Sequence, residues 1–146
     1  MIYLFDLDGT LADLGHRLDL IQQEPADWNA FYMACGDDAP IWEVITVARA
    51  LYESGHKLPI VSGRSEICRL ITVAWLNKYR VPNSGVYMRE AGDYREDNVV
   101  KSELLDRVIA DNPNLKLGGA FEDRQQVVDM YRARGLRVFQ VAPGKF

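Results

Sequence analysis

Two aspartates, Asp6 and Asp8, stand one residue apart after a short apolar run, and Gly9 follows them. The run, residues 2–4, is typical of a buried strand, and glycine permits a sharp turn at its end. Alternation along an extended strand would send both carboxylates to the same side. Open α/β folds bind their ligands at the carboxyl ends of the strands, which is where Asp6 and Asp8 would lie. The pair therefore suits phosphoryl transfer, in which one Asp attacks, the other exchanges protons and a divalent cation neutralises both.

Other polar residues also stand where predicted strands end or predicted helices begin. Ser62 follows the apolar residues 58–61, and its hydroxyl and nearby backbone N–H groups can hold a phosphate oxygen. Lys101 supplies a compact positive charge for the same phosphate. Glu122 and Asp123 add carboxylates, which Mg²⁺ prefers. Each position alone is explained by a turn, a solvated helix or a cap, but their joint order favours a phosphate site.

The elements that must position these residues alternate between strand and helix patterns. This alternation is typical of a parallel sheet covered on both faces. We expect an α/β fold, with a doubly wound, Rossmann-like parallel sheet of about five strands. After the first strand, the expected strands are residues 58–61, 86–88, 117–121 and 138–141.

Helical spacing of apolar residues predicts the buried helix faces between these strands. The expected faces are Ile41, Val44, Ile45, Ala48, Leu51 and Tyr52; then Ile67, Leu70, Ile71, Ala74 and Trp75; then Val100, Leu104, Leu105, Val108 and Ile109. A last helix is expected over residues 125–134. Residues 62–65 are expected to form a strand-to-helix turn, in which Ser65 is a candidate N-cap.

Residues 12–40 lack strand alternation and contain a cluster of aromatic residues, Trp28, Phe31 and Tyr32. We interpret them as a small helical insert over the sheet edge near the acidic pair, with Asp27 as a helix cap. Such aromatic residues more often pack an insert onto its sheet, although an exposed one can stack on a nucleobase.

Length and composition predict a single domain spanning residues 1–146. No apolar run approaches the ~20 residues of a membrane span, and residues 1–8 do not form a signal peptide. Cys35 and Cys68 have no metal-type spacing, which indicates a reducing cytoplasm. The net charge of −4 argues against broad coating of nucleic acid, but not against recognition of one strand end. No P-loop motif is present, so we expect no kinase domain.

The sequence resembles the haloacid dehalogenase (HAD) superfamily of aspartate-nucleophile phosphotransferases. Residues 6–11 match its first motif, Ser62 its second, Lys101 its third and the acidic pair 122–123 its fourth. The chain is more similar still to the 3′-phosphatase domain of bacteriophage polynucleotide kinase. The segments that carry this likeness are residues 61–64, 92–101, 122–131 and 140–146.

The resemblance implies a HAD-like phosphatase with a minimal helical cap that removes the 3′-phosphate from nucleic-acid ends. By this likeness, Asp6 is the nucleophile, Asp8 the general acid and base, and Ser62 and Lys101 hold the phosphate. The expected cofactor is Mg²⁺. Its ligands would be Asp6, the backbone carbonyl of Asp8, and Asp123.

Further positions take their expected roles from the same likeness. Glu122 is an additional candidate metal ligand, although the superfamily usually has aspartate there and the extra methylene changes its reach. The expected substrate-binding residues are Thr10, Arg17, Gly63, Arg64 and Asp97. The expected location is the cytosol of a bacterium or of a phage-infected host, with no membrane partner.

Two other functions stay open at this stage. A phosphatase of free nucleotides, a 5′-nucleotidase, agrees with the acidic pI of 5.2. A catalytically silent phosphate-binding or regulatory module on the same fold is the second. The joint presence of Asp6, Asp8, Ser62, Lys101 and Asp123 argues against a silent module.

Overall fold

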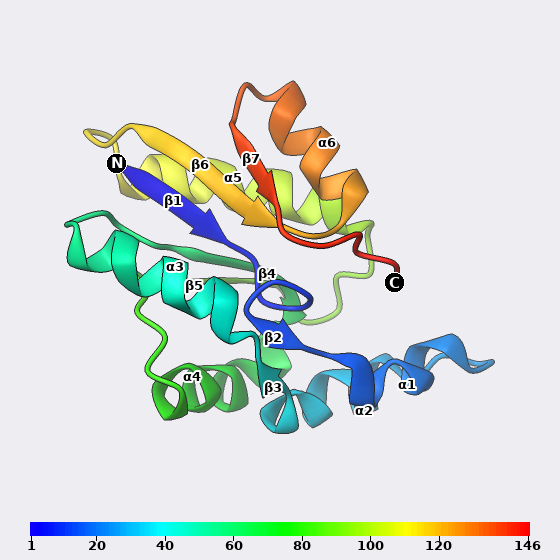
Figure 1. The fold of residues 1–146 in the computed structure, drawn as a ribbon. Coiled ribbons are helices and arrows are strands. Elements are labelled where there is room, and N and C mark those ends of the chain that lie inside the picture. The colour runs from blue at the N-terminus through cyan, green and yellow to red at the C-terminus, as the bar shows by residue number, and fades with distance from the viewer.

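A five-stranded parallel sheet crosses the centre of the computed structural model, which describes residues 1–146 (Figure 1). The strand order is β5-β4-β1-β6-β7, with the N-terminal strand in the middle. The strands are β1 (Ile2–Phe5), β4 (Ile60–Ser65), β5 (Val86–Arg89), β6 (Leu117–Glu122) and β7 (Val138–Gln140). The predicted doubly wound α/β fold is therefore confirmed.

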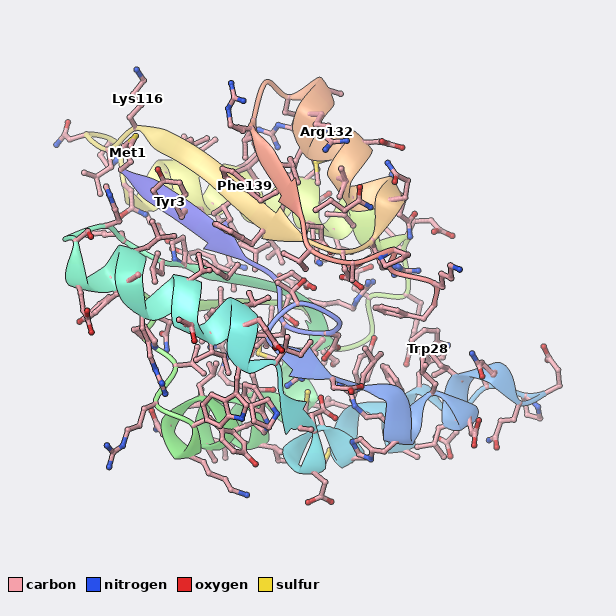
Figure 2. All side chains as sticks on the ribbon, viewed as in Figure 1. Met1, Tyr3, Trp28, Lys116, Arg132 and Phe139 are labelled. Carbon is pink, nitrogen blue, oxygen red and sulfur yellow. The ribbon has the colours of Figure 1, made fainter.

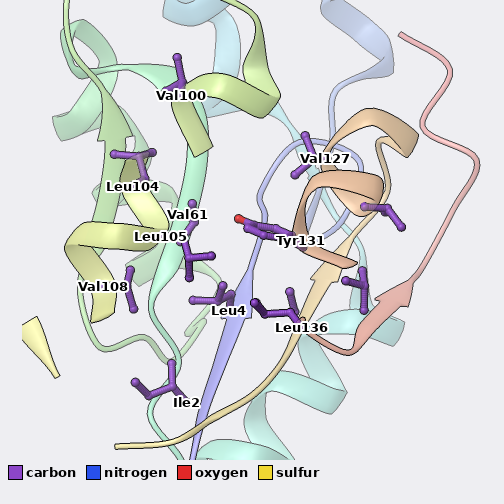
Figure 3. Close-up of a cluster of buried hydrophobic side chains, with 13 residues drawn as sticks. Ile2, Leu4, Val61, Val100, Leu104, Leu105, Val108, Val127, Tyr131 and Leu136 are labelled. Carbon is purple, nitrogen blue, oxygen red and sulfur yellow. The ribbon is translucent and has the colours of Figure 1, made fainter. Parts of the chain in front are cut away.

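Two helices cover each face of the sheet. Helices α3 (Trp42–Glu53) and α4 (Arg69–Lys78) lie on one face, and α5 (Asp97–Asp111) and α6 (Gln125–Ala133) lie on the other. Side chains of β1 alternate between the two cores: Leu4 packs with the α5 and α6 side chains, and Phe5 with those of α3 and α4. Figure 3 shows the first of these cores, where Leu4 and Tyr131 meet residues of α5.

The insert over residues 12–40 is closed at its base by a two-stranded antiparallel ribbon of β2 (Ala12–Asp13) and β3 (Ala39–Pro40). Between these strands lie the short helices α1 (Asp19–Gln22) and α2 (Trp28–Met33) and two 3₁₀ turns (Figure 1). The Asp27 carboxylate accepts the Ala30 N–H at 3.0 Å, so the predicted cap is confirmed. The insert is helical as expected, and the ribbon is an addition that sequence analysis did not predict.

Strand β4 is longer than expected. Residues 62–65, predicted as a turn, continue the strand because Ser65 pairs with Arg89 after a shift in register. Ser65 nevertheless caps the 3₁₀ turn at Glu66–Cys68, since its Oγ accepts the Ile67 N–H at 3.3 Å. The polar end of β4 is therefore held by the sheet itself.

The predicted buried face of α4 was largely wrong. Leu70 is 85% exposed, and Ile67 and Ala74 are also exposed. The buried positions keep helical spacing but each lies one residue after a predicted one, and the polar Thr72 is among them because it accepts from Arg64 Nη1 at 3.1 Å. The side chains that are buried instead are Cys68, Thr72, Trp75 and Leu76. Tyr52 and Ile109, expected on the inner faces of α3 and α5, are exposed near the C-terminal ends of those helices.

None of the helices combines the length and the apolar character needed to cross a lipid bilayer.

Candidate active site

The ends of β1, β4 and β6 and the first turns of α5 meet around a cavity of about 270 Å³. Five of the predicted site residues line this cavity: Asp6, Asp8, Gly63, Asp97 and Lys101. The other predicted site residues do not line it; they are Thr10, Arg17, Ser62, Arg64, Glu122 and Asp123, and all are buried. The predicted residues therefore divide into five in the cavity wall and six buried behind it.

Lys101 stands at the centre of a group of carboxylates. Its Nζ lies 2.7 Å from Asp6 Oδ1, 2.8 Å from Glu122 Oε2 and 3.5 Å from Asp97 Oδ2. Burial alone would lower the pKa of Lys101, but the three carboxylates outweigh it and the pKa is raised. Lys101 is therefore a fixed positive charge beside Asp6.

Asp6, Glu122 and Asp123 form a buried cluster with a surplus of negative charge. Asp123 Oδ1 has no hydrogen-bond partner, although it is buried. Burial, reinforced by Glu122, raises the pKa of Asp6 and brings that of Asp123 to about 7. An unpartnered carboxylate oxygen in an overcharged oxygen cluster fits a hard divalent cation such as Mg²⁺.

Glu122 differs from its two neighbours because protein donors already satisfy both of its oxygens. Oε2 accepts from Lys101, and Oε1 accepts the backbone N–H groups of Asp123 and Arg124 at 3.1 and 3.2 Å. The longer side chain thus reaches Lys101 and holds the turn after β6. Its direct contact with a metal stays a prediction.

Two glycines give the acidic residues room. Gly9 has a φ of +86°, and a Cβ at this position would overlap the Asp123 carboxylate. A Cβ on Gly63 would overlap Asp97 in the same way. Neither position therefore accommodates a side chain while those carboxylates stay in place. Gly9 is thus required by packing against Asp123 as well as by the predicted turn.

Asp8 has an environment opposite to that of Asp6. Its Oδ1 accepts from Arg17 Nη2 at 2.7 Å and from Arg64 Nη2 at 2.6 Å. Burial alone would raise the pKa of Asp8, but Arg64 and Arg17 outweigh it and the pKa is lowered. The Asp8 side chain is still 14% exposed, so it reaches the cavity while its partners do not.

Asp38, which sequence analysis did not predict, forms ion pairs with both Arg17 and Arg64 and does not line the cavity. It is inaccessible to solvent and accepts from Arg17 Nε at 2.8 Å and from Arg64 Nη2 at 2.9 Å. His16 Nε2 lies 2.7 Å from its Oδ1. No local motif marks Asp38, because its arginine partners are 21 and 26 residues away in the sequence.

The two predicted hydroxyl residues have internal partners. Thr10 donates to Asp6 Oδ2 at 3.0 Å and so fixes the carboxylate from the side opposite Lys101. Ser62 Oγ accepts the Arg64 N–H at 3.1 Å. Their contact with substrate stays a prediction.

Three arginines in the cavity wall, Arg89, Arg95 and Arg124, are not among the predicted site residues. Arg89 is buried and donates to the carbonyls of Gly63, Asp93 and Arg95, which ties the β5–α5 loop to β4. Arg124 lies 3.4 Å from Asp97 and over the ring of Phe146, with 5.1 Å to its centroid. All three place positive charge in the cavity wall.

A parallel α/β sheet with a small insert and this acidic centre at the strand ends defines a HAD-type phosphatase. The chain belongs to the family described as the polynucleotide kinase PNKP phosphatase domain, whose model matches residues 1–146. The expected family and enzyme class are therefore confirmed.

Two solved structures support the same family assignment. A chain in the structure of the Pnkp1/Rnl/Hen1 complex is 32% identical, with a TM-score of 0.83 over 99% of this chain and 47% of that one. A chain in the Pnkp1/Rnl/Hen1 RNA repair complex is also 32% identical, with a TM-score of 0.82 over 99% and 43%. The present chain thus spans less than half the length of these relatives.

A more distant structure shares the fold alone. The class C acid phosphatase from Bacillus anthracis with tungstate bound is 13% identical, with a TM-score of 0.65 over 92% of this chain and 60% of that one.

Proposed function

We propose that this chain removes the 3′-phosphate from nucleic-acid ends in a Mg²⁺-dependent reaction with an aspartyl-phosphate intermediate. The observation that carries the proposal is the contrast between two carboxylates in one cavity. Asp6 is paired with Lys101, whereas Asp8 is paired with two arginines. Lys101 favours the ionised carboxylate that attack by Asp6 requires, and the two arginines orient the Asp8 carboxylate at the cavity.

In the first step, an Asp6 oxygen attacks phosphorus, and the bond from phosphorus to the 3′-oxygen of the strand breaks. Because Arg17 and Arg64 lower its pKa, Asp8 relays to that leaving oxygen a proton that enters with the phosphate monoester. In the second step, Asp8 takes a proton from a water molecule that attacks phosphorus. The bond to Asp6 then breaks and inorganic phosphate leaves. Lys101, already 2.7 Å from Asp6, offsets negative charge in both steps.

Mg²⁺ would be held by Asp6, Asp123 and the backbone carbonyl of Asp8. Bound there, the cation would offset the repulsion between the carboxylates and the phosphate. Glu122 would act mainly by holding Lys101 and the turn after β6. Ser62 and Gly63 would offer donors to the phosphate from the end of β4.

Nucleic-acid ends are supported as substrates by the family and by the relative found in an RNA repair complex. Four basic residues, Arg89, Arg95, Lys101 and Arg124, line the cavity beside its acidic residues and can pair with phosphate groups. We also propose a cytoplasmic location, since both cysteines are free.

The test compares kcat/KM on a 3′-phosphorylated oligonucleotide, its 5′-phosphorylated counterpart, and 3′- and 5′-mononucleotides. We expect the 3′-phosphorylated end to be preferred and the activity to require Mg²⁺. A preference for the 5′-mononucleotide would overturn the proposal in favour of a nucleotidase. Full activity after exhaustive chelation would show that the reaction does not require Mg²⁺.

A further inference from the structure

One wall of the active-site cavity is aromatic, and the proposed chemistry does not use it. Trp28 and Tyr32 contribute from α2, Tyr94 from the loop between β5 and α5, and Phe146 from the C-terminal segment. Trp28 is 43% exposed and Tyr94 is 77% exposed. Large aromatic side chains left open to solvent at the rim of a site commonly mark a binding surface.

Trp28 and Tyr94 also line a second hollow, which runs along residues 23–29 of the insert. Because both side chains border both hollows, they mark the boundary between them, at the mouth of the active site. In Figure 2, Trp28 lies between the insert and the C-terminal segment. The mouth is therefore formed by one aromatic side chain from the insert and one from the β5–α5 loop.

The Trp28 ring packs against two neighbouring aromatic side chains of α2. It packs edge-on against Phe31 with 5.6 Å between ring centroids and lies tilted against Tyr32 at 6.0 Å. Phe31 and Tyr32 are both buried. Trp28 therefore offers an apolar surface whose position is set before a ligand arrives.

Charge separates the two hollows. The active-site cavity is lined by four basic residues, Arg89, Arg95, Lys101 and Arg124, together with five acidic ones, whereas the outer hollow contains Glu24 and Asp27 and no basic residue. Only the first hollow therefore offers cationic partners to the phosphates of a nucleic-acid backbone, and the second would repel them. The ligand group that best fits the aromatic rim between the two hollows is therefore uncharged and aromatic, as a nucleobase is.

We propose that Trp28 and Tyr94 form a stacking site for the terminal nucleobase of the strand whose 3′-phosphate is removed. This inference rests on the proposed 3′-phosphatase function. The phosphate lies at Asp6 and Lys101, the base contacts the aromatic rim, and the backbone stays out of the acidic outer hollow. Stacking is tolerant of base identity, so the site selects for the presence of a base and not for its sequence.

The test uses two 3′-phosphorylated oligonucleotides, one with an ordinary terminal base and one with an abasic terminal residue. We expect wild-type kcat/KM to be higher on the first. Trp28→Ala and Tyr94→Ala should each lower kcat/KM on the ordinary end by roughly 5- to 150-fold and leave the abasic end nearly unchanged. Trp28→Phe should retain most of the preference, because it keeps an aromatic face.

Trp42→Ala and Tyr52→Ala are matched controls, because both residues are similarly exposed but lie on α3, outside the cavity. They should leave both rates unchanged. Equal losses on the two oligonucleotides in Trp28→Ala and Tyr94→Ala would overturn the stacking site, and so would no loss on either. Failure of the 3′-phosphatase function itself would appear separately, as wild-type enzyme that hydrolyses a small aryl phosphate but neither oligonucleotide.

Discussion

Arg17 and Asp38 form a two-pronged ion pair, with Nε and Nη2 at 2.8 and 2.6 Å from the two carboxylate oxygens, where neither side chain reaches solvent. Arg64 joins the same carboxylate from β4. Both guanidinium groups then meet Asp8. The insert and the sheet are thus joined through the charge network that orients Asp8.

Asp38→Asn should lower the free energy of unfolding by about 3 kcal/mol, because it leaves two buried guanidinium groups short of negative charge. Turnover of a small aryl phosphate should fall as well, since Asp8 loses its support. Urea denaturation and phosphate release measure the two effects. Asp37→Asn, at the exposed neighbouring position, is the control. A change below about 0.5 kcal/mol for Asp38→Asn, the range of ordinary surface changes, would contradict this account.

Gly9 and Gly55 allow a backbone effect to be separated from a contact effect. Their φ angles are +86° and +88°, but only Gly9 faces a neighbour, Asp123, since nothing lies within 4 Å of a Cβ on Gly55. Alanine at either position should cost about 1–2 kcal/mol for the left-handed conformation. Gly9→Ala should in addition displace Asp123 and abolish most of the turnover. Equal turnover in the two variants would show that the close approach to Asp123 has no role.

Asp123 offers a test of the metal that does not depend on activity. Mg²⁺ should raise the thermal unfolding midpoint of the wild-type protein, because a cation bound only to the folded state stabilises it. Asp123→Asn should lose most of that increase, whereas Asp129→Asn, exposed on α6, should keep it.

Without metal, Asp123→Asn should be at least as stable as wild type at neutral pH. The folded-state pKa of Asp123 is raised to about 7, so the folded state loses stability as pH rises from the unfolded value of about 4 toward 7. The amide removes that loss. An undiminished Mg²⁺ response in Asp123→Asn would exclude this residue as a ligand.

Most of the sheet was predictable, because its strands are short apolar runs that end in polar residues. The convergence of Asp6, Lys101 and Asp97 on one cavity follows from parallel strands ending at the same edge. The buried face of α4 was not predicted from apolar spacing, since it includes the polar Thr72, which accepts from Arg64 Nη1.

The parts of the site that were missed depend on contacts between distant segments. Asp38 follows an exposed acid at the end of a short turn, and only the folded chain brings Arg17 and Arg64 to it. Arg17 and Arg64 were identified from their resemblance to functional positions, but neither lines the cavity. Arg124 lines the wall beside the Phe146 ring, a contact between segments 22 residues apart in the sequence.

Asp6→Asn and Asp8→Asn should separate catalysis from stability. Both should lower turnover, Asp6→Asn by roughly 10³-fold or more because an amide cannot form the covalent intermediate. Asp6→Asn removes one charge from an overcharged cluster and leaves Lys101 paired with Glu122, so its stability should stay close to wild type.

Asp8→Asn takes away the carboxylate that two buried arginines share, so it should lose stability together with turnover. Phosphate release and urea denaturation on the same preparations give both quantities. Near-normal turnover by folded Asp6→Asn would refute the nucleophile. If Asp8→Asn proved as stable as Asp6→Asn, the two carboxylates would not have the opposite environments on which their assigned roles depend.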